Sequence, residues 1–132
     1  MRRSPSVCAP NSRRELSGRS AVRVLTGLVH RGYDIRIFYL WLPSPDLAVA
    51  RVRHRVEGGG HDIPEPVIRR RFQKSLINFD SLYRPLASTW RLYDGSTPGG
   101  YSLIAHGTGA REPVIADRVK WTMIRRQIGD IA

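Results

Sequence analysis

The sequence predicts an α/β fold built on a small, mainly parallel sheet of about three strands. Residues 34–42 form a nearly continuous apolar run, rich in β-branched and aromatic residues, which is typical of a strand buried on both faces. Residues 89–94 form a second strand after about 45 residues of helical pattern, and such a crossover joins parallel neighbours. Residues 101–106 follow closely enough to form a hairpin, so this third strand is expected to be an antiparallel edge.

Capping residues predict where the first two helices begin. A helix over 17–31 begins at Ser17 as N-cap. A second helix has Ser44 as N-cap and Pro45 in its first turn, and the triple glycine Gly58–Gly60 ends it. The predicted core face of the second helix consists of Leu47, Ala48, Val52 and Val56.

A third helix is expected to begin near Asp62 or Ile63 and to end near residue 86. Its apolar side chains recur every three or four positions, at Ile68, Phe72, Leu76, Phe79, Tyr83 and Leu86. Residues 95–100 are predicted to form a Gly/Pro loop. The last helix is expected within 112–128, with apolar positions at Val114, Ile115, Val119, Trp121 and Ile124. The three tryptophans, Trp41, Trp90 and Trp121, are expected to pack the sheet.

The length of 132 residues fits one small domain. Residues 1–15 are predicted to be a disordered lead-in and residues 16–132 the folded unit. Because no apolar run is long enough to cross a bilayer and no secretory signal is evident, we expect a cytoplasmic protein that does not contact membranes. A single cysteine excludes an internal disulfide framework and a multi-cysteine zinc site. The four histidines lack metal-ligand spacing, so no metal site is predicted.

The charge balance indicates a phosphate-bearing partner. Lysine and arginine total 22 against 11 acidic residues, which gives a formal net charge of +11. All but Lys74 and Lys120 of the basic residues are arginines, whose planar guanidinium binds phosphate in bidentate fashion. A GC-rich genome would also favour arginine over lysine, but it would not explain why the arginines cluster.

The densest basic cluster lies on both sides of the triple glycine, over residues 51–74. This segment contains seven basic residues and three acidic ones. Arg51 and Arg55 share a helix face, and so do Arg70 and Lys74. Two basic helices with a flexible glycine tip are typical of a lid that closes over phosphates. An ordinary helical hairpin with a solvated basic face is the alternative interpretation.

The segment RVRHRVEGGGHDIPEPVIRRRFQKSLINFDSLYRPLASTWRLYDGS resembles the lid and following strand of the zeta-toxin family of P-loop kinases. The stretches LSGRS and RGYDIRIFYLWLPSPDLAVARV resemble the part of the family just upstream. The resemblance implies an ATP- and Mg²⁺-dependent transfer of a phosphoryl group to a small molecule, in some members a sugar nucleotide, and an antitoxin protein as a possible partner. It also implies a nucleotide site (ATP or GTP) formed by lid residues Arg51, Arg55, His61, Arg69, Arg70 and Arg71, and an adenine loop formed by Asp94, Gly95 and Ser96.

The sequence departs from this family in its catalytic parts. It contains no G-x-x-x-x-G-K-[ST] motif, and neither Lys74 nor Lys120 lies in one. The family's catalytic aspartate also has no counterpart, so no catalytic residue is assigned. We therefore expect residues 16–132 to be the C-terminal portion of such a kinase, inactive alone, with one edge of strand 34–42 unpaired. Two alternatives stay open: an arginine-rich module that binds nucleic acid, and a fragment that another chain completes.

Overall fold

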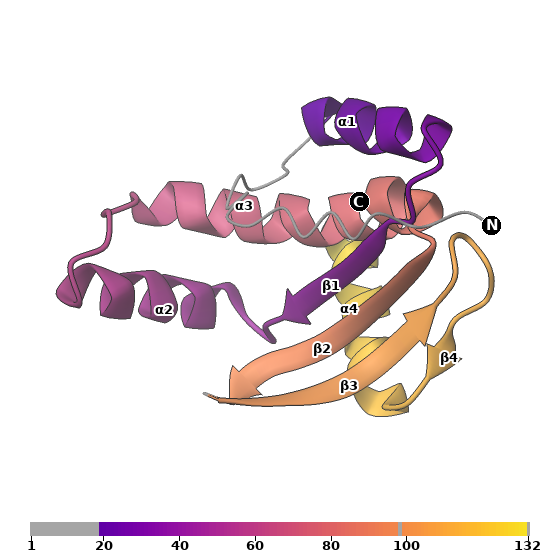
Figure 1. Cartoon of the computed structure of the whole chain (residues 1–132). Helices are drawn as coiled ribbons and strands as arrows, with labels where there is room; N and C mark the ends of the chain where they lie inside the picture. The colour runs from indigo at the N-terminus through magenta and orange to yellow at the C-terminus, as the bar shows by residue number, and fades with distance from the viewer. Residues whose placement is uncertain (1–18, 98, 132) are drawn as a thin grey trace.

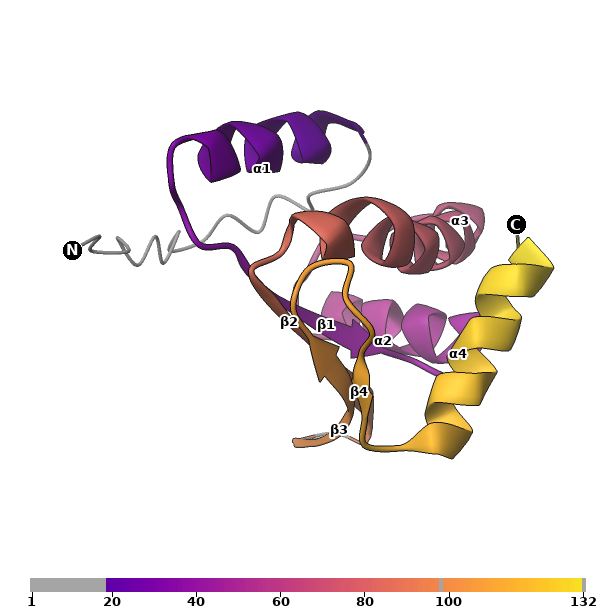
Figure 2. The same cartoon turned by 90° about the vertical axis from the view of Figure 1, so that its right-hand side faces the viewer.

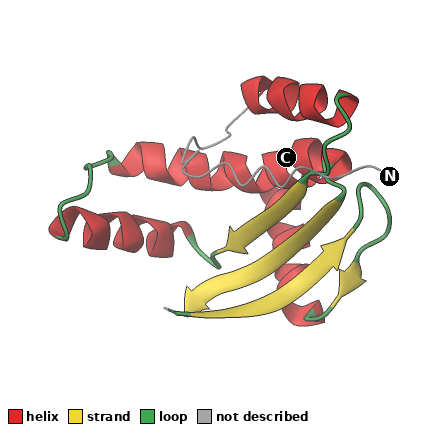
Figure 3. Ribbon diagram, viewed as in Figure 1, coloured by secondary structure: helices red, strands yellow, loops and turns green. Residues whose placement is uncertain are grey.

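The computed structural model describes residues 19–97 and 99–131. The described residues form an α/β fold with four α-helices and an open four-stranded mixed sheet (Figures 1 and 3). The expected lead-in over residues 1–15 and the expected N-cap Ser17 lie outside the described residues. The elements are α1 (Arg19–His30), β1 (Arg36–Trp41), α2 (Pro45–Glu57), α3 (Glu65–Asn78), the π-turn η1 (Phe79–Tyr83), the 3-10 turn η2 (Arg84–Leu86), β2 (Thr89–Thr97), β3 (Gly100–Gly107), β4 (Val114–Ile115) and α4 (Arg118–Ile131).

The sheet confirms the predicted parallel pair and the predicted hairpin. Strand β1 pairs in parallel with β2, and β2 pairs antiparallel with β3. The expected strand count and the expected edge are wrong, because Val114 and Ile115 form strand β4 beyond β3 instead of starting the last helix. Asp117 sets this boundary: its side chain accepts a hydrogen bond from the Lys120 amide at 3.0 Å, as an N-cap does, so α4 starts after it.

The composition of strand β1 predicted burial on both faces, but the structure buries only one face. Its side chains alternate, and Phe38 and Leu40 are 65% and 45% exposed. Ile37 and Tyr39 point the other way and pack against the main core. The reason is that α3 and α4 both cover the same face of the sheet, and no described helix covers the opposite face (Figures 1 and 2).

The predicted loop at 95–100 is also shorter than expected. Strand β2 continues to Thr97, so Asp94, Gly95 and Ser96 lie in a strand rather than in a loop. Gly99, with a φ of 73°, adopts the left-handed conformation that glycine favours and reverses the chain before β3. Of the residues carried over from the family's adenine loop, Asp94 pairs with both neighbouring strands, whereas Gly95 and Ser96 lie in an irregularity of the β2–β3 pairing.

Local sequence signals place the helices well. The Ser44 hydroxyl accepts a hydrogen bond from the Leu47 amide at 3.4 Å, and α2 begins at Pro45 as predicted. The third helix is shorter than expected, because its last turns become η1 and η2. Pro85 lies in η2, where its nitrogen has no hydrogen to donate to a further helical turn.

The main core lies between the sheet and the helices α3 and α4. Trp41 and Trp90 are buried, and Trp121 packs against them, which confirms the predicted role of the tryptophans. The Arg84 guanidinium lies 4.8 Å from the centre of the Trp90 ring and forms a 3.0 Å ion pair with Asp80. The remaining buried members of this cluster are Leu76, Phe79, Ala87, Leu92, Ile104, Ala105 and Ile124.

We predict that Gly107→Ala destabilises the fold. A Cβ at residue 107 would lie 2.9 Å from Cζ2 of Trp90, whose ring is buried and cannot move aside. We expect a loss of about 1–3 kcal/mol in the free energy of unfolding, measured by urea denaturation. Gly27→Ala is the control, because nothing lies within 4 Å of that added Cβ. Equal stability of the two variants would contradict the close packing of Trp90.

Candidate functional site

The helices α2 and α3 form a basic hairpin that leaves the carboxyl end of β1 (Figure 1). The hairpin has a small core of its own, formed by Val49, Val52 and Ile68. Helix α2 ends at Glu57 with Gly58 as its C-cap, and Gly59, with a φ of 96°, lies in the connection over residues 58–64. The structure thus contains the two helices and the glycine tip that the predicted lid requires.

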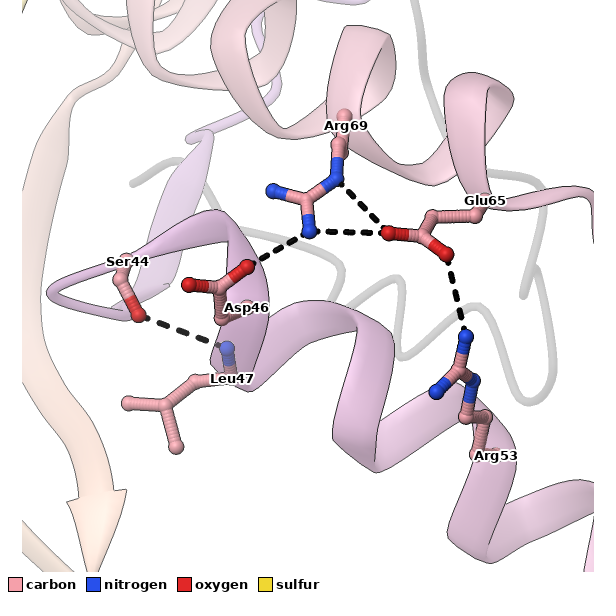
Figure 4. Close-up of polar contacts among 6 residues, drawn as sticks. All are labelled: Ser44, Asp46, Leu47, Arg53, Glu65 and Arg69. Atoms are coloured by element: carbon pink, nitrogen blue, oxygen red, sulfur yellow. Dashed lines mark hydrogen bonds and ion pairs between the residues drawn. The ribbon is translucent and has the colours of Figure 1, made fainter.

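One side of the hairpin carries a network of ion pairs (Figure 4). Arg69 Nη2 lies 2.6 Å from the Asp46 carboxylate and 2.9 Å from Glu65, which in turn accepts a 3.0 Å bond from Arg53. The hydrogen bonds that Arg69 donates to Asp46, and secondly to Glu65, raise the pKa of Arg69. Together with Val49 and His54, these side chains line an open groove of about 460 Å³. Carboxylates therefore already neutralise Arg69, one of the arginines predicted to bind phosphate.

Arg51 lies on the other side of α2 and contacts the sheet. Its guanidinium Nη2 donates a hydrogen bond to the backbone carbonyl of Gly95 in β2. Arg55 follows one helical turn later and shares this face. Its side chain is exposed, and its guanidinium makes no ion pair or hydrogen bond within residues 19–97 and 99–131. The structure thus brings a predicted phosphate-binding arginine, Arg51, into contact with the residues carried over from the adenine loop.

Asp94 is a charged group in the interior at the same end of β2. It is only 7% exposed, and its carboxylate lies 2.7 Å from Lys120 Nζ. A second bond comes from the Ser96 amide at 2.8 Å. Burial disfavours the charged form, but the bonds from Lys120 and Ser96 outweigh it and lower the pKa of Asp94. The hydrogen bond to Asp94 is also the main cause that raises the pKa of Lys120. Asp94 is therefore a carboxylate with its charge satisfied inside the protein.

Sequence reasoning missed Lys120. This lysine comes from the first turn of α4, and it also lies 3.7 Å from the Asp117 carboxylate. Its contact with Asp94 depends on how α4 folds back under the sheet, which no local pattern encodes. The only available signal was the rarity of lysine in this chain, which did not point to a partner.

The remaining predicted lid residues are not gathered at this place. Arg70 and Arg71 are exposed on α3, and His61 is exposed in the connection at the hairpin tip. Successive helical residues differ by about 100° in direction, so Arg69, Arg70 and Arg71 do not share a face. The run of three arginines therefore does not form one guanidinium cluster.

The described residues do not by themselves fit a magnesium site. No group of three histidine, cysteine, aspartate or glutamate side chains is placed to hold a metal ion in that part of the chain. The Asp94 carboxylate already binds Lys120 and the Ser96 amide.

Within the described residues, no helix is long and apolar enough to cross a membrane.

Comparison with protein-family models, curated proteins and solved structures found no match to this chain. The position of Arg51 at the carboxyl end of the parallel strands is the most informative feature, because ligands of open α/β sheets bind at that edge.

We predict that Asp94→Asn lowers stability at neutral pH and that the difference shrinks in acid. Asp94 has a lowered pKa in the folded state, so it contributes stability above its unfolded-state pKa of about 4, and this contribution is lost as the pH falls through its folded-state pKa. We expect a loss of about 1–3 kcal/mol at pH 7 in urea denaturation. Asp62→Asn, in the exposed hairpin tip, is the matched control. A deficit that stays constant down to pH 2 would contradict this role.

Proposed function

We propose that this chain binds the phosphates of a nucleoside triphosphate, ATP or GTP, through Arg51 and Arg55, as the C-terminal part of a zeta-toxin-like P-loop kinase. The observation that supports it best is the hydrogen bond from Arg51 to the Gly95 carbonyl. This bond holds the basic face of α2 at the carboxyl end of β1 and β2. Open α/β sheets bind their ligands at that edge.

The local electrostatics favour an anion at this face. Arg51 and Arg55 are like charges one turn apart, which destabilises a helix by a few tenths of a kcal/mol. Two of the hairpin's carboxylates, Asp46 and Glu65, are engaged on the other side with Arg53 and Arg69, and Glu57 lines the same groove. A phosphate group between Arg51 and Arg55 would supply the missing negative charge in a bidentate geometry that guanidinium groups favour.

The proposed role is binding rather than complete catalysis. The sequence contains no P-loop motif, and phosphoryl transfer depends on that motif to position the β- and γ-phosphates. No step through Mg²⁺ is assigned, because the described residues offer no cluster of metal ligands. In this proposal the intact reaction transfers the γ-phosphate of ATP to a hydroxyl of a small molecule such as a sugar nucleotide. An antitoxin protein belongs to the same proposal as a possible partner.

A nucleic-acid-binding module is the second candidate. The net charge of +11 favours it, and so do exposed arginines away from the hairpin, such as Arg125 and Arg126 on α4. Sequence-independent phosphate contacts spread over several faces would produce strong salt dependence without a discrete site. Under this alternative, each exposed arginine contributes by its charge and not by its position.

We predict that Arg55→Ala weakens ATP binding while Arg53→Ala does not. Both changes remove one exposed positive charge from α2, but only Arg55 lies on the face of Arg51. We expect Kd, measured by isothermal titration calorimetry, to rise about tenfold for Arg55→Ala and less than about twofold for Arg53→Ala.

Two results would overturn the proposal. The first is an equal loss of ATP affinity in the Arg55→Ala and Arg53→Ala variants. The second is the lack of saturable ATP binding together with tight, strongly salt-dependent binding of duplex DNA, which would favour the nucleic-acid module.

A further inference from the structure

No described helix covers one face of the sheet (Figure 2), and several apolar side chains on that face are exposed. Strand register places Phe38 and Leu40 of β1 beside Arg91 and Tyr93 of β2, and the rings of Phe38 and Tyr93 stack with centroids 6.5 Å apart. Strand β3 adds Leu103, opposite Tyr93. Four large exposed apolar or aromatic side chains project from this face by strand alternation and register: Phe38, Leu40, Tyr101 and Val114.

Apart from tyrosine, the ionisable side chains on this face are two arginines and a histidine. Arg36 pairs with Thr89, and Arg91 pairs with His106, so two arginines and a histidine adjoin the apolar side chains. None of the outward positions named for strands β1 to β4 carries a carboxylate. Apolar side chains with basic groups beside and between them are therefore the chemical character of this surface, which we call the open sheet face. Arg91 lies next to Phe38, and His106 lies between Arg91 and Val114.

A parallel strand pair normally has both faces covered. The pair β1–β2 is covered on one face by the main core and is open on the other. Exposed apolar surface of this kind marks an interaction site. Amphipathic helices are the elements that normally pack on such a sheet face, and α3 and α4 do so on the opposite face.

We infer that the open sheet face binds an acidic amphipathic helix of a partner protein. The partner's apolar stripe would contact Phe38, Leu40 and Tyr93, and its flanking carboxylates would pair with Arg36 and Arg91. Charge selects this partner over a second copy of the chain, because each copy carries +11 and a two-fold contact would bring the same arginines together. This inference does not depend on the proposed nucleotide site.

Two synthetic helical peptides test the inference. Both have about 18 residues and the same leucine stripe, but one has glutamate and the other lysine at the flanking positions. Binding to the full chain is measured by fluorescence anisotropy of labelled peptide. We expect the glutamate peptide to bind with a Kd at least about tenfold lower than that of the lysine peptide. Phe38→Ser should raise the Kd of the glutamate peptide about fivefold or more.

Val119→Ser is the matched control, because Val119 is 73% exposed on α4, away from the open sheet face. Urea denaturation of both variants establishes that they are folded. The inference would be overturned if the two peptides bound with equal affinity, or if Phe38→Ser and Val119→Ser weakened binding of the glutamate peptide equally. A dimer of the chain alone, seen by sedimentation and dissociated by Phe38→Ser, would overturn it too, because the occupant would then be a second copy. Peptide binding that protects the β1 amides from exchange but is indifferent to Phe38→Ser would instead indicate strand addition, and would also overturn it.

Discussion

The guanidinium of Arg51 donates a hydrogen bond to the backbone carbonyl of Gly95, and this contact joins α2 to the carboxyl end of strand β2. The contact matters because α2 is otherwise packed mainly on α3, through a core of Val49, Val52 and Ile68 that is separate from the main core. The far end of α3 enters the main core through Leu76. The hairpin is therefore continuous with the sheet along α3, and the Arg51 contact places one face of α2 at the carboxyl end of β2.

The charges of the hairpin are divided between its two sides. Asp46 and Glu65 hold Arg69 and Arg53 on one side, in exposed pairs that contribute little to stability but do neutralise charge (Figure 4). On the other side, the Arg51 guanidinium donates to a carbonyl oxygen, which is polar but uncharged, and it makes no ion pair within the described residues. A net positive charge thus remains at the end of the parallel strands. The carboxylates of Asp46, Glu57 and Glu65 all line the groove on the opposite side, so the positive charge of α2 is concentrated at Arg51 and Arg55.

The sequence predictions were correct where the interactions are local along the chain and wrong where they depend on contacts between distant segments. The start of α2 depends on Ser44 and its neighbours in sequence, and its position was predicted correctly. The parallel pairing of β1 and β2 followed from a helical crossover, which is also encoded along the chain. By contrast, the pairing of Asp94 with Lys120 and the exposure of Phe38 depend on which elements meet in space. The three arginines at 69–71 looked like one cluster in the sequence, but helical geometry and the carboxylate of Asp46 separate them.

The central claim is that phosphate binds at the Arg51 side of α2. A titration of the full chain with inorganic tripolyphosphate, followed by ¹H–¹⁵N NMR, tests it most directly, because the signals of Gly95, Ser96 and the two arginine side chains, Arg51 and Arg55, report on that edge. We predict that the largest saturable shifts occur at these groups and that the signals of Arg53 and Arg69 change little. Shifts centred on the groove of Arg53 and Arg69, or spread evenly over all exposed arginines, would contradict the claim.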